Sequence, residues 1–453
     1  MDQNEIDRFQ KIAGGGKKKL DAEIKRLAEI DPPRIDRKEC PECKATAVEI
    51  PVFTEEEEYA AFRKELADLR LKYEPFLTDR GEKITAPIVK KELKEFKYRK
   101  ETDEDKECFI NVLNGYGEWQ DITLPKYEGS VGVWNAFYRT EIEIGEKAIG
   151  KRYLVEFEAV DEIAEVYLNG RMIARHEGFF APFEADLTDY LICGKNVLLI
   201  VVKNDITTSG IEIDGFTHYG KKIYAETHLG YDEPYLGWHH CPAGAGIFGK
   251  VYFCVTEEQR ISDIFVQPDI DGGKITIKTT VRDYSFSHEK YKIKYSVEGR
   301  NFESTPIFIE SETNFTTNGE NYITQEVAIE NFRLWTHDEP YLYNLTVTLV
   351  SNEKTIDRKK THFGMRKFRM DESSEPKGAF YLNNKRIILR GTNEMGHLPR
   401  AVMDGDDQRL IDDILIAKVA NLNFYRMTQR PVFDKIYTYF DMLGMLCQTD
   451  FPL

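Results

Sequence analysis

The sequence contains no apolar run that approaches the roughly 20 residues that a membrane-spanning helix needs. Its first eight residues include neither a basic segment nor an apolar one, so we expect no secretory signal. Basic residues are in the minority, with 62 Lys and Arg against 78 Asp and Glu and a net charge of -16. Nucleic-acid binding depends on basic patches that neutralise phosphates. We therefore expect no membrane partner and no nucleic-acid partner.

Cysteine is also scarce, with 7 residues scattered along a chain of 453. An odd and scattered set is not the pattern of a disulfide scaffold and favours a reducing compartment, so we expect a cytoplasmic protein. Cys40 and Cys43 form one C-x-x-C pair, which is half of a structural zinc site. Because no second pair or nearby histidine completes it, we interpret the pair as two free thiols in a loop.

What the sequence does contain is enough apolar material for several cores. Hydrophobic residues make up 41% and aromatic residues 12% of the chain, and the length allows roughly three domains. Residues 1–87 differ from the rest, because 17–30 and 55–73 are rich in charge and carry apolar residues at helical spacing. We predict a helical N-terminal extension there, and the sequence assigns it no role.

The next segment, 88–257, changes to a period of two. Apolar and polar residues alternate along 153–158, and a further apolar strand is predicted at 196–203. An Asn-Gly pair at 169–170 separates two short apolar runs, which is the signal of a two-residue hairpin turn. These features predict an all-β sandwich.

A second β block is predicted at 258–367. The odd-numbered residues of 291–297 are all apolar and the even-numbered ones are polar, as in a strand with one buried face. About a hundred residues of such short strands predict an immunoglobulin-like sandwich without the cysteine pair.

The last segment, 368–453, alternates strands with helices. We predict strands at 386–391, 423–427 and 445–450 and helices at 404–420 and 432–443, the second helix ending at Gly444. This order predicts a parallel sheet and the opening of a (β/α)8 barrel. A closed barrel needs eight units and roughly 250 residues, so only the first three units are expected here. The predicted fold class is therefore a mainly β, multidomain protein.

Short motifs then point to a family. Residues 155–160, 164–170 and 176–183 resemble the sugar-binding domain of glycoside hydrolase family 2, which includes β-galactosidases, β-glucuronidases and β-mannosidases. The resemblance implies that 88–257 form a galactose-binding-like jelly-roll β-sandwich. Residues 246–251 resemble the end of that domain, and 363–366 resemble the exit from the family's immunoglobulin-like domain. Residues 383–393 resemble its first barrel strand. The resemblance covers about 115–453.

The resemblance implies a retaining hydrolase that cleaves a terminal β-glycosidic bond with two carboxyl groups about 5–5.5 Å apart. In the family both are glutamates on the fourth and seventh barrel strands. We therefore expect both beyond Leu453 and expect this chain to be inactive alone. Two alternatives remain open: a non-catalytic carbohydrate-binding or scaffold protein, and one half of a split enzyme whose other strands come from a second chain.

The resemblance also implies a sugar pocket at the carboxyl ends of the strands, where barrel enzymes place their active sites. Asn393 and Glu394 end the first strand, and we interpret Glu394 as lining or supporting the pocket, not as the acid/base. Arg426 matches an arginine that orients the nucleophile. The remaining candidates are His397, Asp450, Asp205 from the sandwich, and Gln429, which stands where many relatives carry a histidine.

Each of these candidates has an ordinary structural interpretation as well, such as a barrel ion pair for Arg426 or a turn for Asp205. The expected partner is a carbohydrate substrate, together with a homo-oligomer or a complementing barrel chain. We expect no cofactor and no metal ligand set in this chain. A magnesium ion belongs to some galactosidases of the family, and Asp450 would then need ligands from beyond the chain's end.

Overall fold

The computed structural model divides the chain into two compact units, Met1–Ala60 and Ala61–Leu453. Predictions that fall at 17–30 and at Cys40 and Cys43 lie outside the residues that the structure describes. The described residues are 54–83, 89–126, 133–161, 163–178, 181–205, 211–213, 216–218, 246–285, 290–316, 318–373, 377–394, 396–428 and 431–451.

The predicted helix at 55–73 is present as α2 (Glu55–Leu77). At its start Thr54 and Glu57 form a reciprocal cap, because the Thr54 amide donates to Glu57 Oε2 at 2.9 Å and the Glu57 amide donates to Thr54 Oγ1 at 3.3 Å. Among the described helices, none combines the length and the apolar character needed to cross a membrane.

The first sandwich consists of two antiparallel sheets with the orders β3-β2-β4-β9-β6-β7 and β1-β12-β5-β8. The larger sheet contains β2 (Glu95–Lys100), β3 (Gln120–Thr123), β4 (Val133–Ile144), β6 (Ile163–Leu168), β7 (Arg171–Glu177) and β9 (Gly194–Asp205). The smaller sheet contains β1 (Val89–Glu92), β5 (Lys151–Phe157), β8 (Phe183–Asp186) and β12 (Val251–Glu257). Two short helices, α3 (Asp103–Glu107) and α4 (Phe109–Leu113), and a hairpin of β10 (Ile211–Ile213) and β11 (Phe216–His218) complete the description.

The core of this sandwich follows the alternation in the sequence. Tyr153, Val155 and Phe157 of β5 are buried in one cluster with residues of the facing sheet, as predicted. Asn169 and Gly170 have φ of 50° and 83°, the left-handed conformation that a two-residue hairpin turn requires, and they join β6 to β7. The predicted hairpin is confirmed.

The immunoglobulin-like sandwich has a three-stranded sheet, β13-β14-β17, and a four-stranded sheet, β16-β15-β18-β19. Its strands are β13 (Gln259–Asp269), β14 (Lys274–Asp283), β15 (Lys290–Gly299), β16 (Ile307–Asn314), β17 (Gly319–Ala328), β18 (Tyr343–Ser351) and β19 (Lys354–Phe363). Tyr291, Ile293, Tyr295 and Val297 of β15 are all buried in the core between the sheets, so the predicted face is confirmed.

The prediction of a barrel strand at 386–391 is wrong in its position. Asn383 and Asn384 adopt positive φ of 51° and 65°, and this turn folds β22 (Lys385–Ile387) back antiparallel onto β21 (Ala379–Leu382). With β20 (Phe368–Asp371) they form a separate small sheet. The first barrel strand begins only at Gly391, because the turn at Asn383 and Asn384 pairs the start of the apolar run with β21.

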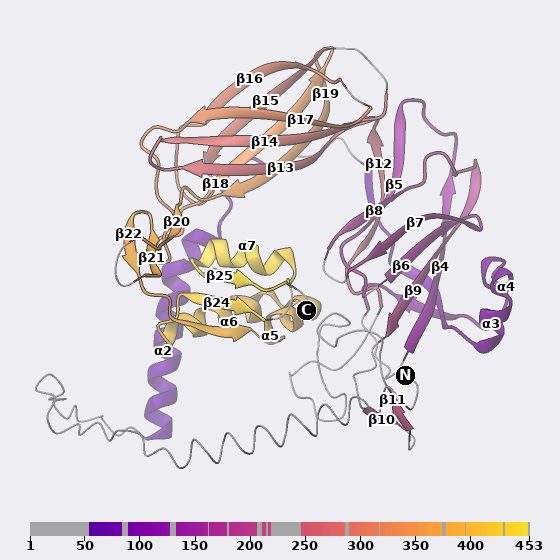
Figure 1. Cartoon of the computed structure of the whole chain (residues 1–453), viewed down its shortest axis with the longest axis horizontal. Helices are drawn as coiled ribbons and strands as arrows, with labels where there is room; N and C mark the ends of the chain where they lie inside the picture. Colours follow the sequence, from indigo (N-terminus) through magenta and orange to yellow (C-terminus); the bar gives the residue numbers. More distant parts are fainter. Residues whose placement is uncertain are drawn as a thin grey trace, which may run out of the picture. The chain divides into compact units, whose positions relative to one another are not determined.

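The barrel segment is a parallel sheet in the order β23-β24-β25, made of β23 (Gly391–Glu394), β24 (Phe424–Met427) and β25 (Leu446–Thr449). Its helices are α5 (His397–Met403), α6 (Asp407–Val419) and α7 (Asp434–Leu443) (Figure 1). Helix α5 was not predicted. Helix α6 is capped by Asp406, whose carboxylate accepts from the Arg409 amide at 3.0 Å, and α7 ends at Gly444 with a φ of 68°.

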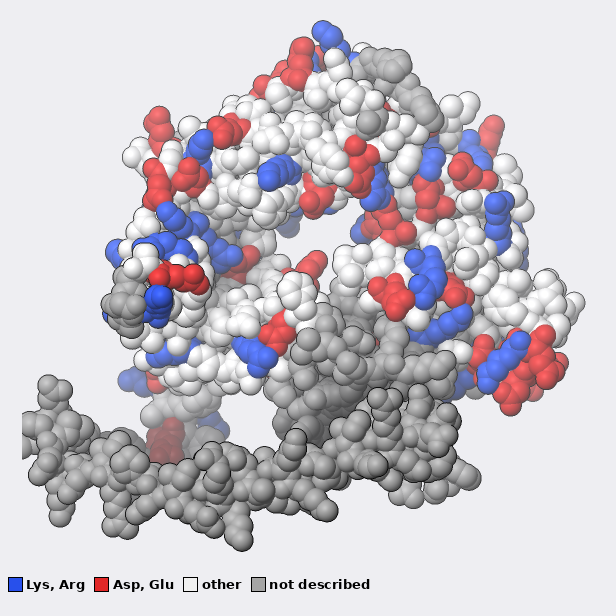
Figure 2. Space-filling model, viewed as in Figure 1, with Lys and Arg blue, Asp and Glu red and all other residues white. Residues whose placement is uncertain are grey.

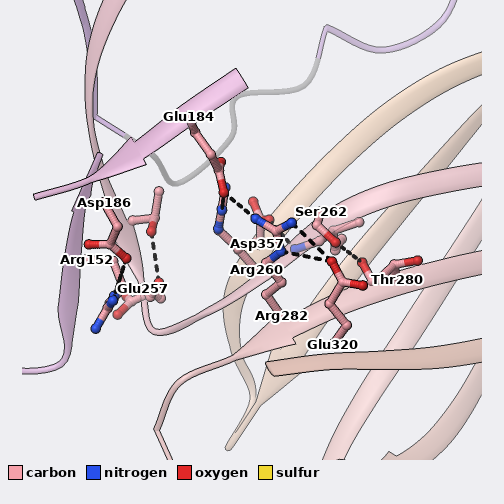
Figure 3. Close-up of polar contacts among 12 residues, drawn as sticks. Arg152, Glu184, Asp186, Glu257, Arg260, Ser262, Thr280, Arg282, Glu320 and Asp357 are labelled. Carbon is pink, nitrogen blue, oxygen red and sulfur yellow. Dashed lines mark hydrogen bonds and ion pairs between the residues drawn. The ribbon is translucent and has the colours of Figure 1, made fainter. Parts of the chain in front are cut away.

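Glu184 of β8 links the first sandwich to the immunoglobulin-like one. Its carboxylate pairs with Arg260 of β13 and Arg282 of β14, and Arg282 also contacts Glu320 of β17 at 3.1 Å (Figure 3). Nearby, buried Asp357 accepts hydrogen bonds at 2.8 Å from the amides of Ile261 and Arg358. Burial raises the pKa of Asp357.

Charged side chains elsewhere are mixed in sign. Figure 2 shows Lys and Arg interspersed with Asp and Glu over the described part of the face in view. Many of them form exposed pairs, such as Lys97 with Asp121 at 2.6 Å, which contribute little to stability. Glu184 differs because 28% of its side chain is exposed and one of its partners, Arg260, is 10% exposed.

We predict that Glu184→Gln destabilises the protein by about 2 kcal/mol, because two guanidinium groups lose their shared carboxylate and one of them stays buried. Calorimetry of thermal unfolding measures the effect. The matched control is Glu320→Gln, which removes a more exposed carboxylate from the same Arg282 and should cost about 0.5 kcal/mol. Equal losses in the two variants would contradict the linking role of Glu184.

Candidate active site

The carboxyl edge of the barrel sheet carries a row of polar side chains. Parallel pairing places Asn393 of β23 opposite Arg426 of β24, and Arg426 opposite Gln448 of β25. Residues in register on neighbouring strands project from the same face of a sheet. Two residues earlier on that face, Phe424 and Leu446 belong to an apolar cluster. The face therefore changes from an apolar base to a polar edge.

Arg426 and Asp450 form the central pair of this edge. Arg426 Nε lies 3.2 Å from Asp450 Oδ1 and Nη2 lies 2.5 Å from Oδ2, the two-point geometry that suits a guanidinium and a carboxylate. The Asp450 amide donates to the Met427 carbonyl at 3.1 Å, which holds the residue directly after β25 against β24. Gln448 Nε2 also donates to Asp450 Oδ1 at 3.2 Å. The guanidinium plane is therefore fixed, while 42% of the Arg426 side chain remains exposed.

The opposite face of the sheet packs on the helices. The ring of Tyr425 stacks on Phe440 of α7 at 5.3 Å between centroids, and its hydroxyl donates to the Asp413 carbonyl of α6 at 3.4 Å. Burial, together with the charges of Asp413 and Glu394, raises the pKa of Tyr425 above its usual range. Met427 on the same face is completely buried. In β24 the packed side is therefore that of Tyr425 and Met427, and the partly exposed side is that of Arg426.

Glu394 belongs to the helix side and not to the polar row. Its side chain is 3% exposed, and Oε1 accepts from the amides of Gly396 at 2.6 Å and Leu398 at 3.2 Å. The Nδ1 atom of His397 lies 3.4 Å from the same oxygen, and the imidazole is 38% exposed. Asn393, one residue before, is exposed. The Asn-Glu pair thus divides between the two faces, and the carboxylate satisfies backbone donors where α5 begins.

Two other candidate residues, Asp205 and Gln429, are described only in part or not at all. Asp205 is the last residue of β9, where its backbone pairs with Val133, but its side chain is outside the description. Gln429 lies outside the described residues. Within the described ranges, no group of three His, Cys, Asp or Glu side chains is arranged to hold a metal ion.

Two further features of the barrel segment were not predicted from the sequence. Asn423, which is 2% exposed, uses its side chain to accept from the Arg390 amide at 2.9 Å and to donate to the Ile388 carbonyl at 3.0 Å, aligning the starts of β23 and β24. Phe248 of the first sandwich packs edge-on against Phe433, the residue before α7, with 5.4 Å between ring centroids. Phe248 lies in the 246–251 motif, so that motif was the one sequence feature that could have pointed to this contact.

Comparison with known protein families finds matches along three successive parts of the chain. Models of one family match three successive segments: "Glycosyl hydrolases family 2, sugar binding domain" at 105–229, "Glycosyl hydrolases family 2" at 259–366, and "Glycosyl hydrolases family 2, TIM barrel domain" at 376–450. The three matched segments follow one another in the same order as the two sandwiches and the barrel segment of the structure. The chain belongs to glycosyl hydrolase family 2, and the predicted family and fold class are confirmed.

Individual relatives are distant. A β-galactosidase of Thermoanaerobacter pseudethanolicus is 28% identical over 325 residues, covering 70% of this chain and 39% of the relative. A putative β-glucuronidase of Formosa agariphila is 25% identical over 373 residues, covering 76% of this chain and 39% of the relative. The chain therefore spans about two fifths of the length of these relatives.

A solved structure shows the same fold. The β-glucuronidase of Bacteroides uniformis superposes with a TM-score of 0.63 at 18% identity, covering 81% of this chain and 42% of that one. At this identity the likeness concerns the fold alone.

We predict that Glu394→Ala loosens α5, because two amides at its start lose their acceptor in a buried position. Hydrogen exchange of the α5 amides should accelerate about tenfold, corresponding to the loss of about one buried hydrogen bond. Asn393→Ala is the control, since its exposed side chain should leave α5 unchanged. Unchanged exchange in Glu394→Ala would show that the carboxylate does not support the helix.

Proposed function

We propose that the chain contributes the sugar-binding sandwich, the immunoglobulin-like domain and the first strands of the active-site barrel to a retaining glycosidase. The substrate is a terminal β-linked sugar. One observation carries the proposal: Asn393, Arg426 and Asp450 meet at the carboxyl edge of the parallel sheet, where barrel enzymes bind their substrates. The names of the relatives, β-galactosidase and β-glucuronidase, support this substrate class.

Arg426 is proposed to hold the nucleophilic carboxylate through its exposed guanidinium nitrogens. Retaining hydrolysis requires one carboxylic acid to protonate the leaving oxygen and one carboxylate to attack the anomeric carbon, about 5–5.5 Å apart. A fixed guanidinium orients such a carboxylate and keeps it ionised. Asp450 fixes the guanidinium from its other side, and Asn393 is placed to donate a hydrogen bond to a sugar hydroxyl. The acid/base and nucleophile glutamates are proposed to lie on later barrel strands.

The other candidates take supporting roles in this proposal. His397 and Glu394 support the strand end, and Asp205 and Gln429 would add hydrogen-bonding groups to the sugar pocket. A glutamine at position 429 argues against galactosidase-like specificity, because many relatives carry a histidine there. A magnesium ion on Asp450 would need further ligands, and a homo-oligomer or a complementing barrel chain is the proposed partner besides the carbohydrate.

The proposed compartment is the cytoplasm. The four described cysteines, Cys108, Cys193, Cys254 and Cys447, are free thiols, which fits a reducing environment.

Activity measurements test the proposal. The 453-residue chain and the product of its whole reading frame are assayed side by side on aryl β-galactosides and aryl β-glucuronides, with the anomer of the released sugar followed by NMR. We expect no turnover by the chain alone and turnover with retention of configuration by the longer product. Turnover by the chain alone that disappears in Glu394→Gln would contradict the assignment, and inactivity of both proteins would favour a non-catalytic carbohydrate-binding module.

In the active protein, Arg426→Lys should lower kcat about 10- to 100-fold. An ammonium group cannot contact Asp450 at two points and hold the nucleophilic carboxylate at the same time. Asp450→Asn should lower kcat less, since the guanidinium remains but is less well fixed. Steady-state kinetics measure both effects. Arg409→Lys, which changes an exposed arginine of α6, is the control and should leave kcat unchanged. A loss confined to KM would show that Arg426 binds substrate without acting on the nucleophile.

A further inference from the structure

The part of α2 that belongs to the larger unit carries an apolar seam. Apolar residues recur in this helix at alternating intervals of four and three, which places them on one side of it. They are Phe62, Leu66, Leu69, Tyr73 and Phe76. They belong to the same hydrophobic cluster as residues of α5, α6 and α7. Leu66 is 8% and Tyr73 is 1% exposed. The seam is therefore packed on the barrel helices.

Polar contacts set the register of this packing. Arg70 Nε and Nη2 each lie 2.8 Å from a carboxylate oxygen of Asp412 in α6. Three residues further along α2 and six further along α6, Lys418 Nζ lies 4.7 Å from the centroid of the Tyr73 ring. Lys418 also donates to the His337 carbonyl at 2.8 Å and to the carbonyl at the end of α7 at 3.0 Å. Burial lowers the pKa of Lys418 to about 8. The Arg70–Asp412 and Tyr73–Lys418 contacts therefore join α2 to α6 at two places.

The end of α2 contacts the immunoglobulin-like sandwich. The Tyr73 hydroxyl donates to the His337 carbonyl at 2.9 Å. The Phe76 ring meets Tyr341 edge-on at 5.4 Å, and Asn301 Nδ2 donates to the Phe76 carbonyl at 3.3 Å. The same helix thus touches the barrel segment along its length and the neighbouring sandwich at its end.

The residues after α2 continue along the sandwich. Asp79 accepts from Asn344 Nδ2 at 2.8 Å and from Lys360 Nζ at 3.0 Å, and its carboxylate lies 3.5 Å from Arg300 Nη1. Burial raises the pKa of Asp79, but the hydrogen bonds and the nearby positive charges lower it by more, so the net shift is downward. The Arg80 amide donates to the Arg300 carbonyl at 2.7 Å. The carboxylate therefore stays ionised among three donors of the sandwich.

We propose that residues 61–82 form a strap that fastens the barrel segment to the immunoglobulin-like sandwich and supports the strands β23, β24 and β25 from the side of their helices. In a (β/α)8 barrel the helices make up the outer ring, so their outward surface is ordinarily free. Here that layer receives an additional helix. The strap lies outside the three segments that match the family, which begin at residue 105. The role is independent of whether the protein hydrolyses a sugar.

The two domains also meet without the strap, so the strap strengthens a joint that already exists. Trp335 of the sandwich is fully buried, and its Nε1 donates to the Asp441 carbonyl of α7 at 2.7 Å. His362 and Arg366 approach the Asp441 carboxylate at 3.2 and 3.6 Å. Lys418 of α6 also reaches the sandwich directly, through the His337 carbonyl at 2.8 Å. The strap therefore adds a second connection between α6 and the sandwich.

Charge reversal at one contact tests the strap in the full chain. Arg70→Asp and Asp412→Arg each bring two like charges together, and hydrogen exchange of the α6 amides should become about fivefold faster, as expected for losing a partly exposed ion pair. The double variant Arg70→Asp with Asp412→Arg restores opposite charges and should return exchange to the original rate. Amides of β4 and β9 in the first sandwich provide the internal reference and should not change.

A second pair of variants tests the apolar seam, and both replace a leucine of α2 with aspartate. Leu66→Asp, at a buried seam position, should accelerate exchange in both α2 and α6, and thermolysin should cut the segment 61–82 faster. Leu71→Asp lies in the same helix, where the side chain is 69% exposed, and should behave as the unmodified chain. If Leu66→Asp does not fold, the charge-reversal series alone decides. No restoration in the double variant, or the same exchange in Leu66→Asp and Leu71→Asp, would overturn the strap.

Discussion

Backbone pairing among three parallel strands of four residues each holds the polar edge of the barrel segment together. The register places Asn393, Arg426 and Gln448 in one row, and Asp450 then meets Arg426 at two points. Gly391 allows the close approach this requires, because a Cβ there would lie 2.4 Å from the Phe424 ring. A slip of one residue would exchange the two faces and turn Arg426 into the apolar layer beneath the helices.

Other contacts supply the support that so short a sheet needs. Tyr425 and Met427 anchor it on α6 and α7, and the strap anchors α6 in turn through Arg70 and Tyr73. Glu184 connects the two sandwiches, and the contacts around Trp335 connect the second sandwich to the barrel segment. Arrangements of this kind preorganise a site, since residues that will contact the substrate are fixed before it arrives.

Much of this could be predicted because the sequence patterns are local. The alternation of apolar and polar residues predicted the buried face of β15. Asn169 and Gly170 predicted a hairpin, and Gly444 predicted the end of α7. The same local logic misplaced the first barrel strand, since the apolar run at 386–391 pairs through the Asn383–Asn384 turn with its own neighbour. Family motifs identified Arg426 and Asp450 as pocket candidates, but no motif revealed that Glu394 supports α5.

The sequence by itself determined the order of the domains, the class of each sheet and the residue types at the strand ends, because period, turn chemistry and motifs are properties of neighbouring residues. Only the tertiary structure decided which side chains share a face of the sheet, which partner Arg426 has, and that α2 packs on α6. Those facts depend on contacts across 24 residues for Arg426–Asp450 and 342 residues for Arg70–Asp412. Such contacts form only when distant segments are buried together, and no local pattern encodes their geometry.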